Sequence, residues 1–273
     1  FALFLRDLMR DHREDLVGRA FDAGRPERFP LLLKLLDARA DLSVQVHPND
    51  EHAQRLRPDA AGKTECWYVL DADPGARIYR GLAPGTTAGQ LEAAARRGDL
   101  GDLLHHVPVR PGDAVFVPAG TVHAIGAGIR LVEIQQTSDI TYRVFDWNRP
   151  GMDGRPRELH LERALEVIDW QPSGPDLCEA RELDLPHGRA RQLVEHPKLR
   201  VRELSAFTGD PIPLDTGAER FHLLTVVAGR ACLEAADGAV DRQALDSALI
   251  PAVTGRYTLT PTPDATVLLF DRP

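Results

Sequence analysis

The chain has 273 residues, 43% hydrophobic and 27% charged, a balance typical of a globular protein with a sizeable core. Its formal net charge of −8 argues against nucleic acid as the main partner. No apolar run approaches the roughly 20 residues that span a membrane, so we expect no membrane partner. Three widely spaced cysteines, Cys66, Cys178 and Cys232, support neither a disulfide framework nor a zinc knuckle, and favour a reducing cytoplasm.

The first part of the chain alternates between helical and strand patterns. The sequence begins with Phe and lacks a signal-peptide pattern, so we expect a trimmed N-terminus. Helical spacing over 3–16 predicts one or two helical turns, and an apolar run over 29–36 predicts a buried strand leading into another over 41–47. Residues 64–70 and 76–79 are predicted to pair around the turn Asp73-Pro74-Gly75.

Further elements follow in a mainly β order. Residues 87–104 predict a helix capped by Thr86 or Thr87, and 158–170 predict an amphipathic helix. Strands are predicted at 114–117, 122–125, 129–136 and 140–146. After a linker-like stretch at 171–175, short strands are predicted near 189–195, 199–206, 221–228, 230–235, 247–250 and 256–260.

The strand at 41–47 carries a polar face. Apolar residues alternate there with Ser43, Gln45 and His47, so one face packs and the other presents a hydroxyl, an amide and an imidazole. Such groups are costly to bury without partners, so water, a metal ion or a ligand should lie opposite them. The strand stops at the breaker Pro48, which places His47 near an opening.

A second motif strengthens the metal interpretation. Gly112, Pro118, Gly120 and His123 have the spacing of the second signature motif of cupins, which hold a metal on inward-facing side chains of a β-barrel. Ala127 stands where that family usually has Asn, so we assign it no role. The resemblance implies a mainly β fold: a cupin-type jelly-roll barrel with inserted helices over 1–170, and a smaller, degenerate cupin-like domain without metal ligands over 171–273.

Between these motifs lies the stretch Lys63-Thr64-Glu65-Cys66-Trp67-Tyr68, in which Lys63 and Glu65 share one strand face. If that face points inward, Glu65 joins the polar strand residues and His123. Two imidazoles, a carboxylate and an amide oxygen suit zinc or another first-row divalent ion.

Together these segments resemble type I mannose-6-phosphate isomerases in their short bacterial form. The resemblance is clear over about 29–170 and rests on five stretches: 42–51, 63–68, 118–123, 133–143 and 146–149. It implies one zinc ion per chain, held by Gln45, His47, Glu65 and His123. It also implies an active-site arginine at Arg143, phosphate contacts near Lys34, Ser43 and Lys63, and acidic pocket residues at Glu133 and Asp139. The family's opening Trp-Gly-Gly strand is missing from this sequence.

The implied activity is interconversion of mannose 6-phosphate and fructose 6-phosphate through an enediol(ate). A divalent metal and an arginine suit this chemistry because both stabilise negative charge developing on oxygen. The proton shuttle stays open between Lys63, Glu133 and a zinc-bound water. The expected partner is a small sugar phosphate, and the expected assembly is a monomer or weak homodimer.

Simpler roles and other functions compete with this interpretation. Arg143 could pair with Asp139 or Asp146, Lys34 could extend to the surface, and Ser43 could bond to backbone. An iron cupin oxygenase is disfavoured by Gln45 in place of a histidine and by the lysines. A non-catalytic cupin that binds a sugar or sugar phosphate is disfavoured by intact metal ligands beside Arg143.

Overall fold

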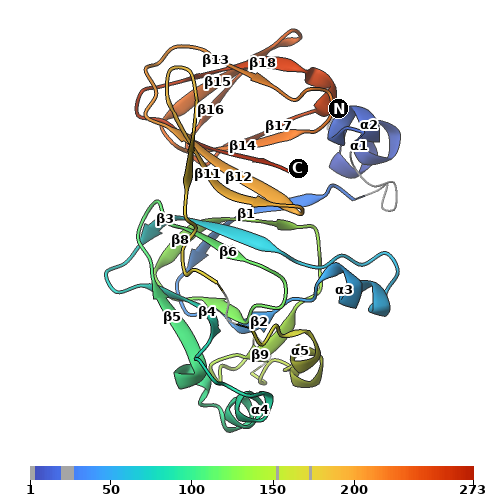
Figure 1. Cartoon of the computed structure of the whole chain (residues 1–273), viewed down its shortest axis with the longest axis vertical. Coiled ribbons are helices and arrows are strands. Elements are labelled where there is room, and N and C mark those ends of the chain that lie inside the picture. The colour runs from blue at the N-terminus through green and yellow to red at the C-terminus, as the bar shows by residue number, and fades with distance from the viewer. Residues whose placement is uncertain (1–3, 20–27, 152–153, 172–173) are drawn as a thin grey trace. The chain divides into compact units, whose positions relative to one another are not determined.

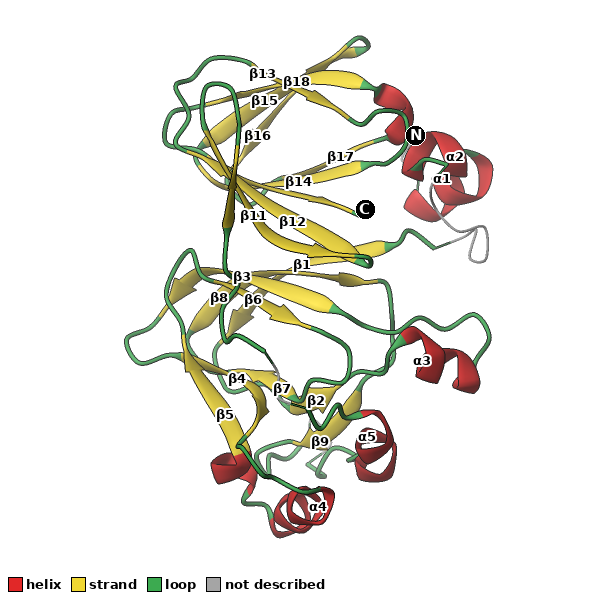
Figure 2. Ribbon diagram, viewed as in Figure 1, coloured by secondary structure: helices red, strands yellow, loops and turns green. Residues whose placement is uncertain are grey.

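The computed structural model describes residues 4–19, 28–151, 154–171 and 174–273, and strands dominate it (Figures 1 and 2). The start of the predicted helix at residue 3 and residues 172–173 of the predicted linker lie outside the described residues. The chain forms two compact units. One, the site unit, comprises Leu31–Cys178; the other combines Glu179–Pro273 with the described residues before Leu31. The expected division at residue 170 therefore differs from this grouping at both ends of the site unit.

The site unit contains two antiparallel sheets, ordered β1-β8-β3-β6 and β5-β4-β7-β2-β9. Its strands are β1 (Leu31–Ala38), β2 (Val44–Val46), β3 (Glu65–Ala72), β4 (Arg77–Leu82), β5 (Leu104–Pro108), β6 (Ala114–Val117), β7 (His123–Ile125), β8 (Ile129–Gln136) and β9 (Tyr142–Phe145). Its helices are α3 (Asp50–Leu56), α4 (Ala88–Arg97), the 3-10 turn η1 (Leu100–Leu103) and α5 (Leu161–Val167).

Two apolar clusters fix the orientation of the strands in this unit. One joins the sheets through fully buried residues such as Trp67, Val115 and Ile78. The other packs Val44 and Val46 of β2 in a cluster with residues of α4 and α5. Because successive strand residues point to opposite faces, the polar residues of β2 face away from that helix-lined cluster.

Helix α4 shows how local sequence sets element boundaries. The Thr87 side chain accepts from the Gln90 backbone N–H while the Gln90 side chain bonds back to the Thr87 N–H, forming a capping box. The helix ends at Arg97 because Gly98 adopts a left-handed conformation (φ 81°). The predicted helix over 87–104 was therefore too long, and its last residues form η1 and the start of β5.

The predicted pairing of 64–70 with 76–79 is wrong. Strand β3 pairs with β8 and β6, whereas β4 pairs with β5 and β7 in the other sheet. The turn at Asp73-Pro74-Gly75 carries the chain from one sheet to the other, which a turn motif alone does not reveal. Strand β1 is also less buried than predicted, because Leu32 and Leu35 are 38% and 46% exposed.

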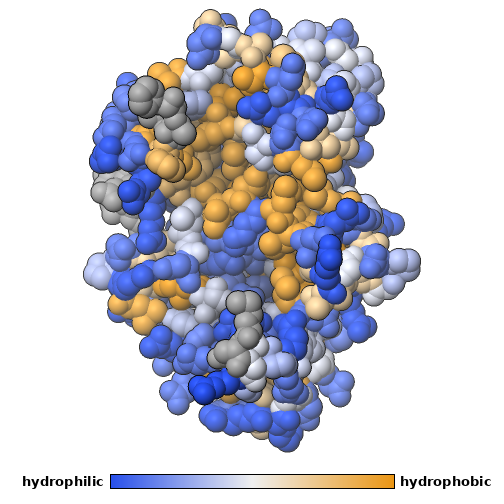
Figure 3. Space-filling model, turned by 180° about the vertical axis from the view of Figure 1, so that it is seen from behind, coloured by the Kyte–Doolittle hydropathy of each residue, from blue (hydrophilic) through white to orange (hydrophobic). Residues whose placement is uncertain are grey.

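The second unit is also a pair of antiparallel sheets, ordered β10-β11-β12-β19-β14-β17 and β13-β18-β15-β16, around a buried cluster that includes Ile212, Leu224 and Val267. Its elements are α1 (Leu5–Asp11), α2 (Arg13–Val17), β10 (Arg181–Leu183), β11 (Arg189–His196), β12 (Leu199–Ser205), β13 (Ile212–Asp215), β14 (His222–Ala228), β15 (Arg230–Ala235), β16 (Gly238–Gln243), β17 (Ser247–Ile250), the 3-10 turn η2 (Ala252–Thr254), β18 (Arg256–Pro261) and β19 (Thr266–Asp271). Figure 3 shows apolar side chains gathered in a hollowed area of this unit.

The expected fold class, mainly β with inserted helices and jelly-roll-like units, is confirmed. Among the described helices, none is long and apolar enough to cross a membrane.

Candidate metal centre

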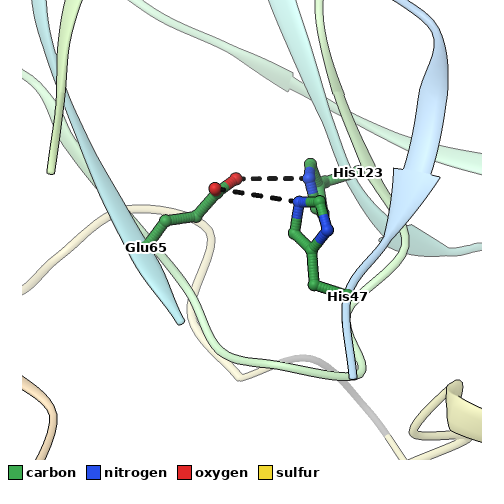
Figure 4. A group of neighbouring side chains, drawn as sticks. All are labelled: His47, Glu65 and His123. Carbon is green, nitrogen blue, oxygen red and sulfur yellow. Dashed lines mark ion pairs between the residues drawn. The ribbon is translucent and has the colours of Figure 1, made fainter. Parts of the chain in front are cut away.

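His47, Glu65 and His123 point toward one another in the interior of the site unit (Figure 4). The Nε2 atom of His123 lies 3.2 Å from Glu65 Oε1, and that of His47 lies 3.8 Å from Glu65 Oε2. All three residues are buried, and one ligand atom from each falls within 4.8 Å of the others. Within the described residues this is the only such group of His, Cys, Asp and Glu.

The tautomers of both histidines are set by backbone carbonyls. Nδ1 of His47 lies 3.2 Å from the Ile140 carbonyl oxygen, and Nδ1 of His123 lies 2.8 Å from that of Thr121. A carbonyl oxygen only accepts, so Nδ1 carries the proton in each ring and Nε2 presents its lone pair. Both lone pairs therefore face the Glu65 side of the cluster, as in metal-ligating histidines whose other nitrogen is hydrogen-bonded.

A close approach of two backbone segments positions Glu65. The Gly62 N–H donates to Asp50 Oδ1 (2.7 Å), and the Lys63 N–H donates to the Pro48 carbonyl (3.0 Å). A Cβ on Gly62 would lie 2.5 Å from the Asn49 and Asp50 backbone, so only glycine fits there. The turn that ends the His47 strand is thereby held against the start of β3.

The corner before His123 is fixed in a similar way. Gly120 has φ 89°, a conformation that glycine adopts readily, and its N–H donates to the His47 carbonyl (2.8 Å). Its own carbonyl accepts from the Asp169 N–H (2.9 Å). Gly120 thus ties together the two segments that carry the histidines.

A chain of charged groups leads away from the histidines. Lys63 Nζ lies 2.5 Å from Glu65 Oε2 and 2.9 Å from His47 Nε2. It is also 3.9 Å from Glu133 Oε1, which in turn accepts from Lys34 Nζ at 2.8 Å. Lys34 is 37% exposed at its side chain while Lys63, Glu65 and Glu133 are buried, so the chain runs from the interior towards solvent.

Burial dominates the electrostatics of the histidines. Desolvation lowers the pKa of His123 to about 4, and the Lys63 ammonium acts in the same direction. The pKa of His47 also lies well below its usual range, chiefly through burial and then through Lys63. Both imidazoles are therefore neutral at physiological pH, the form that binds metal ions.

The other site residues that the sequence predicted lie on strands around this cluster or outside it. Gln45 pairs with His123 on β7 and Arg143 on β9, and its side-chain Nε2 donates to the buried Ser43 hydroxyl at 3.2 Å. Arg143 is half-buried and donates through Nη1 to the Glu158 carbonyl at 2.9 Å. Burial lowers the pKa of Arg143, with Arg157 acting in the same direction.

The acidic partners considered for Arg143 are engaged elsewhere. Asp146 accepts from Arg149 and Arg157, and Asp139 forms an ion pair with Arg57 at 2.8 Å. Asp139 is 63% exposed at its side chain, so the structure does not bring it into the buried cluster. Its contact with substrate stays a prediction.

Gln135 is a site residue for which we predicted no role. It is fully buried on β8, two residues from Glu133 on the same strand face, and its Oε1 accepts from Lys34 Nζ at 2.6 Å. Its register partner on β3 is Glu65. Strand parity indicated its direction, but its contact with Lys34 depends on a pairing of β1 with β8 that the sequence does not reveal.

The donor set fits a divalent metal ion. Two imidazole nitrogens with oriented lone pairs and one carboxylate, all buried, match the three protein ligands of catalytic zinc sites, and other first-row ions accept the same donors. The half-buried amide of Gln45 stands opposite His123 as a fourth candidate. A mainly β unit with an interior cluster that could hold a metal ion is the arrangement of the cupin class.

Comparison with known proteins narrows that class. Residues 2–69 match the family described as phosphomannose isomerase type I, catalytic domain. The chain is 48% identical over 166 residues to mannose-6-phosphate isomerase ManA of Bacillus subtilis (61% of this chain, 51% of the relative). It is 44% identical over 164 residues to mannose-6-phosphate isomerase of Streptococcus mutans (60% and 50%).

The solved structure of mannose 6-phosphate isomerase from Bacillus subtilis superposes with a TM-score of 0.86 at 30% identity, covering 97% of this chain and 81% of that one. The chain belongs to the type I phosphomannose isomerase family. It spans about half the length of the curated relatives it matches.

Proposed function

We propose that this chain is a zinc-dependent isomerase that interconverts mannose 6-phosphate and fructose 6-phosphate through an enediol(ate). The proposal rests above all on the buried His47–Glu65–His123 cluster and its direct connection to Lys63. Family membership supports the same substrate class.

The proposed zinc ion is held by His47, Glu65 and His123, with Gln45 as the fourth protein ligand. When bound, it supplies an electrophile that polarises the oxygens at the reacting carbons.

The formal charges of the surrounding residues suit a phosphorylated substrate. Lys34 and Lys63 balance Glu65 and Glu133, so the cluster of four is formally neutral. A divalent metal makes the site doubly positive, which complements the dianion of a sugar phosphate. In this proposal Lys34, at the solvent end, and Ser43 bind the phosphate, and this remote binding energy orients the sugar.

Proton transfer between C1 and C2 is assigned to Lys63, Glu133 or a zinc-bound water; Lys63 Nζ and Glu133 Oε1 lie 3.9 Å apart, which is too far for a direct hydrogen bond between them. Arg143 stabilises the negative oxygen of the enediolate. It stands opposite Gln45 on β9, and a guanidinium retains its charge despite burial.

The test is a coupled assay of fructose 6-phosphate formation from mannose 6-phosphate, before and after chelation and again with zinc restored. We expect activity to disappear on chelation and to return with zinc. Arg39→Ala, which changes a side chain that is 91% exposed, serves as the matched control for Arg143→Ala. A metal-loaded protein that binds mannose 6-phosphate without converting it would replace this function with that of a sugar-phosphate-binding cupin.

The proposal extends to the setting of the enzyme. We propose that the protein acts on a small sugar phosphate as a monomer or weak homodimer. We also propose that it is cytoplasmic, because its three widely spaced cysteines favour a reducing compartment. Size-exclusion chromatography with light scattering measures the assembly directly.

A further inference from the structure

A cavity in the site unit lies apart from the metal ligands. It has a volume of about 320 Å³ and is lined by Arg80 of β4, His105 of β5 and residues that follow α5, among them Asp169, Trp170 and Asp176. None of the four proposed metal ligands belongs to its lining. Pockets that bind small molecules measure roughly 300–1,000 Å³, so this cavity is large enough for a small ligand.

The wall of the cavity that follows α5 is attached to strands of both sheets. His105 Nε2 lies 2.7 Å from Asp176 Oδ1, which joins this wall to β5. Cys178 donates its backbone N–H to the Ala114 carbonyl on β6 at 2.8 Å. Both bonds join segments that are far apart in the sequence, so the cavity is built into the fold of the site unit.

Arg80 brings a buried hydrogen-bond donor to this cavity. It is 3% exposed, and its Nε donates to the Phe116 carbonyl at 2.8 Å. Its Nη1 atom is buried and has no acceptor among the described residues. A buried donor without an acceptor is costly, and an oxygen atom of a bound molecule would remove that cost. Arg80 therefore indicates a ligand that carries hydrogen-bond acceptors.

The charges around the cavity favour a neutral ligand over an anion. Asp169 and Asp176 place two carboxylates in the lining, against the one guanidinium of Arg80. A protonated His105 would only balance the second carboxylate, so the lining has no excess positive charge for a phosphate. Carboxylates accept hydrogen bonds and a guanidinium donates them, and a hydroxyl group pairs with either. A ligand rich in uncharged hydroxyl groups matches this lining.

Trp170 adds an apolar surface to the lining. It is 40% exposed, whereas Trp67 in the core is 1% exposed. The face of an aromatic ring carries partial negative charge and attracts C–H groups, which carry partial positive charge. A pyranose ring presents C–H groups on its faces and hydroxyl groups around its rim. One face of such a ring can contact the indole while the rim contacts the polar side chains.

We propose that this cavity is a second ligand site, which binds an uncharged pyranose sugar. Trp170 stacks against one face of the sugar ring, Arg80 donates to a sugar oxygen, and Asp169 and Asp176 accept from sugar hydroxyls. The site is separate from the metal centre and takes a ligand without a phosphate group. The proposal does not depend on the isomerase function proposed above.

The test uses the full chain with isotope-labelled nitrogen, in which the three tryptophans give three indole N–H signals by NMR. Trp170→Phe identifies the Trp170 signal by its loss. We expect D-glucose to shift the Trp170 signal saturably and to leave the Trp147 signal in place. Sorbitol carries similar hydroxyls without a ring, so it should bind at least about tenfold more weakly. Inorganic phosphate should leave the Trp170 signal unchanged.

Variants test the stacking contact. Trp170→Ala should weaken glucose binding about tenfold in a saturation-transfer NMR titration, whereas Trp170→Phe keeps an aromatic face and should retain most of the affinity. Val253→Ala, which shortens a 61% exposed side chain in the second unit, is the control and should bind as the parent does. Equal affinities of Trp170→Ala and the parent would overturn the proposal.

The labelled chain also distinguishes the competing sites. An unmoved Trp170 signal with glucose, or a shift caused by phosphate instead, would overturn the proposal. The Trp67 ring lies 5.5 Å from the His123 ring, centroid to centroid. A glucose shift confined to Trp67 would therefore place the sugar at the metal centre and overturn the proposal as well. None of these measurements depends on isomerase activity, so their failure leaves the proposed function unaffected.

Discussion

Acidification should weaken the second unit through one buried histidine. His222 on β14 is 6% exposed at its side chain; its Nδ1 lies 2.8 Å from the Tyr257 hydroxyl and its Nε2 3.8 Å from Asp271 Oδ2. Burial lowers its pKa from 6.5 to about 4. Asp271 opposes this shift, while Arg200, Arg202 and Arg220 reinforce it.

The direction in which stability changes with pH follows from proton uptake. Between pH 6.5 and about 4 the unfolded chain binds a proton at His222 that the folded chain does not. The stability present above pH 6.5 is therefore lost as the pH falls towards 4. At about 1.4 kcal/mol per pKa unit, the total loss is about 3 kcal/mol, most of it already reached at pH 4.5.

Tryptophan fluorescence cannot follow the second unit, because all three tryptophans lie in the site unit. The assay is therefore peptide-resolved hydrogen exchange in increasing urea at pH 7.5 and 4.5. The parent chain is compared with His222→Gln in peptides from β14 and β19. We expect the stability advantage of the parent to shrink by about 2–3 kcal/mol at the lower pH.

His187→Asn is the matched control. His187 is 49% exposed at its side chain and has φ 60°, a conformation that asparagine tolerates well, so this variant measures what an exposed histidine contributes at the two pH values. A pH-independent difference between the parent and His222→Gln would refute the reasoning about burial.

Three further predictions concern the site unit. Glu65→Gln should weaken zinc binding by more than about 100-fold in a competition titration, because Glu65 would contact the metal directly and loss of even an outer-shell partner costs about 10- to 100-fold. Glu133→Gln, which would not remove a ligand, is the control, and equal losses of affinity in the two variants would argue against Glu65 as a ligand. Lys34→Met should raise the KM for mannose 6-phosphate about tenfold or more, whereas the exposed control Arg39→Met should leave the KM unchanged. An unaltered KM in Lys34→Met would mean that Lys34 does not bind the phosphate. Thr87→Ala should destabilise the site unit by about 1 kcal/mol in urea unfolding followed by tryptophan fluorescence, because α4 loses its capping box, and no change would show that the cap contributes little.

Strand parity and local motifs made much of the site predictable. Alternation over 41–47 placed Gln45 and His47 on the face opposite Val44 and Val46, and the structure packs those valines in the cluster shared with α4 and α5. The cupin spacing located His123 because Gly120 must take a positive φ and bond to the His47 carbonyl. The alternation and the positive φ of Gly120 are local requirements, so they leave a direct trace in the sequence.

Strand partners and contacts between segments far apart in the sequence were not predictable. The sequence placed β3 and β4 side by side because a turn motif joins them, although they belong to different sheets. Strand β16 was missed because its residues are almost all exposed and show no apolar alternation. The contact of Lys34 with Gln135 and the association of α2 with η2 rest on pairings across many residues, which composition and periodicity do not encode.

The bonds around β6 have a consequence for self-association. β6 is the last strand of its sheet, and an unpaired strand edge offers carbonyls and N–H groups to strands of other molecules. The outward carbonyls of Ala114 and Phe116 are already taken by the Cys178 N–H and the Arg80 guanidinium. A foreign strand would have to displace both before it could extend the sheet, so this edge is guarded against the intermolecular pairing that begins aggregation.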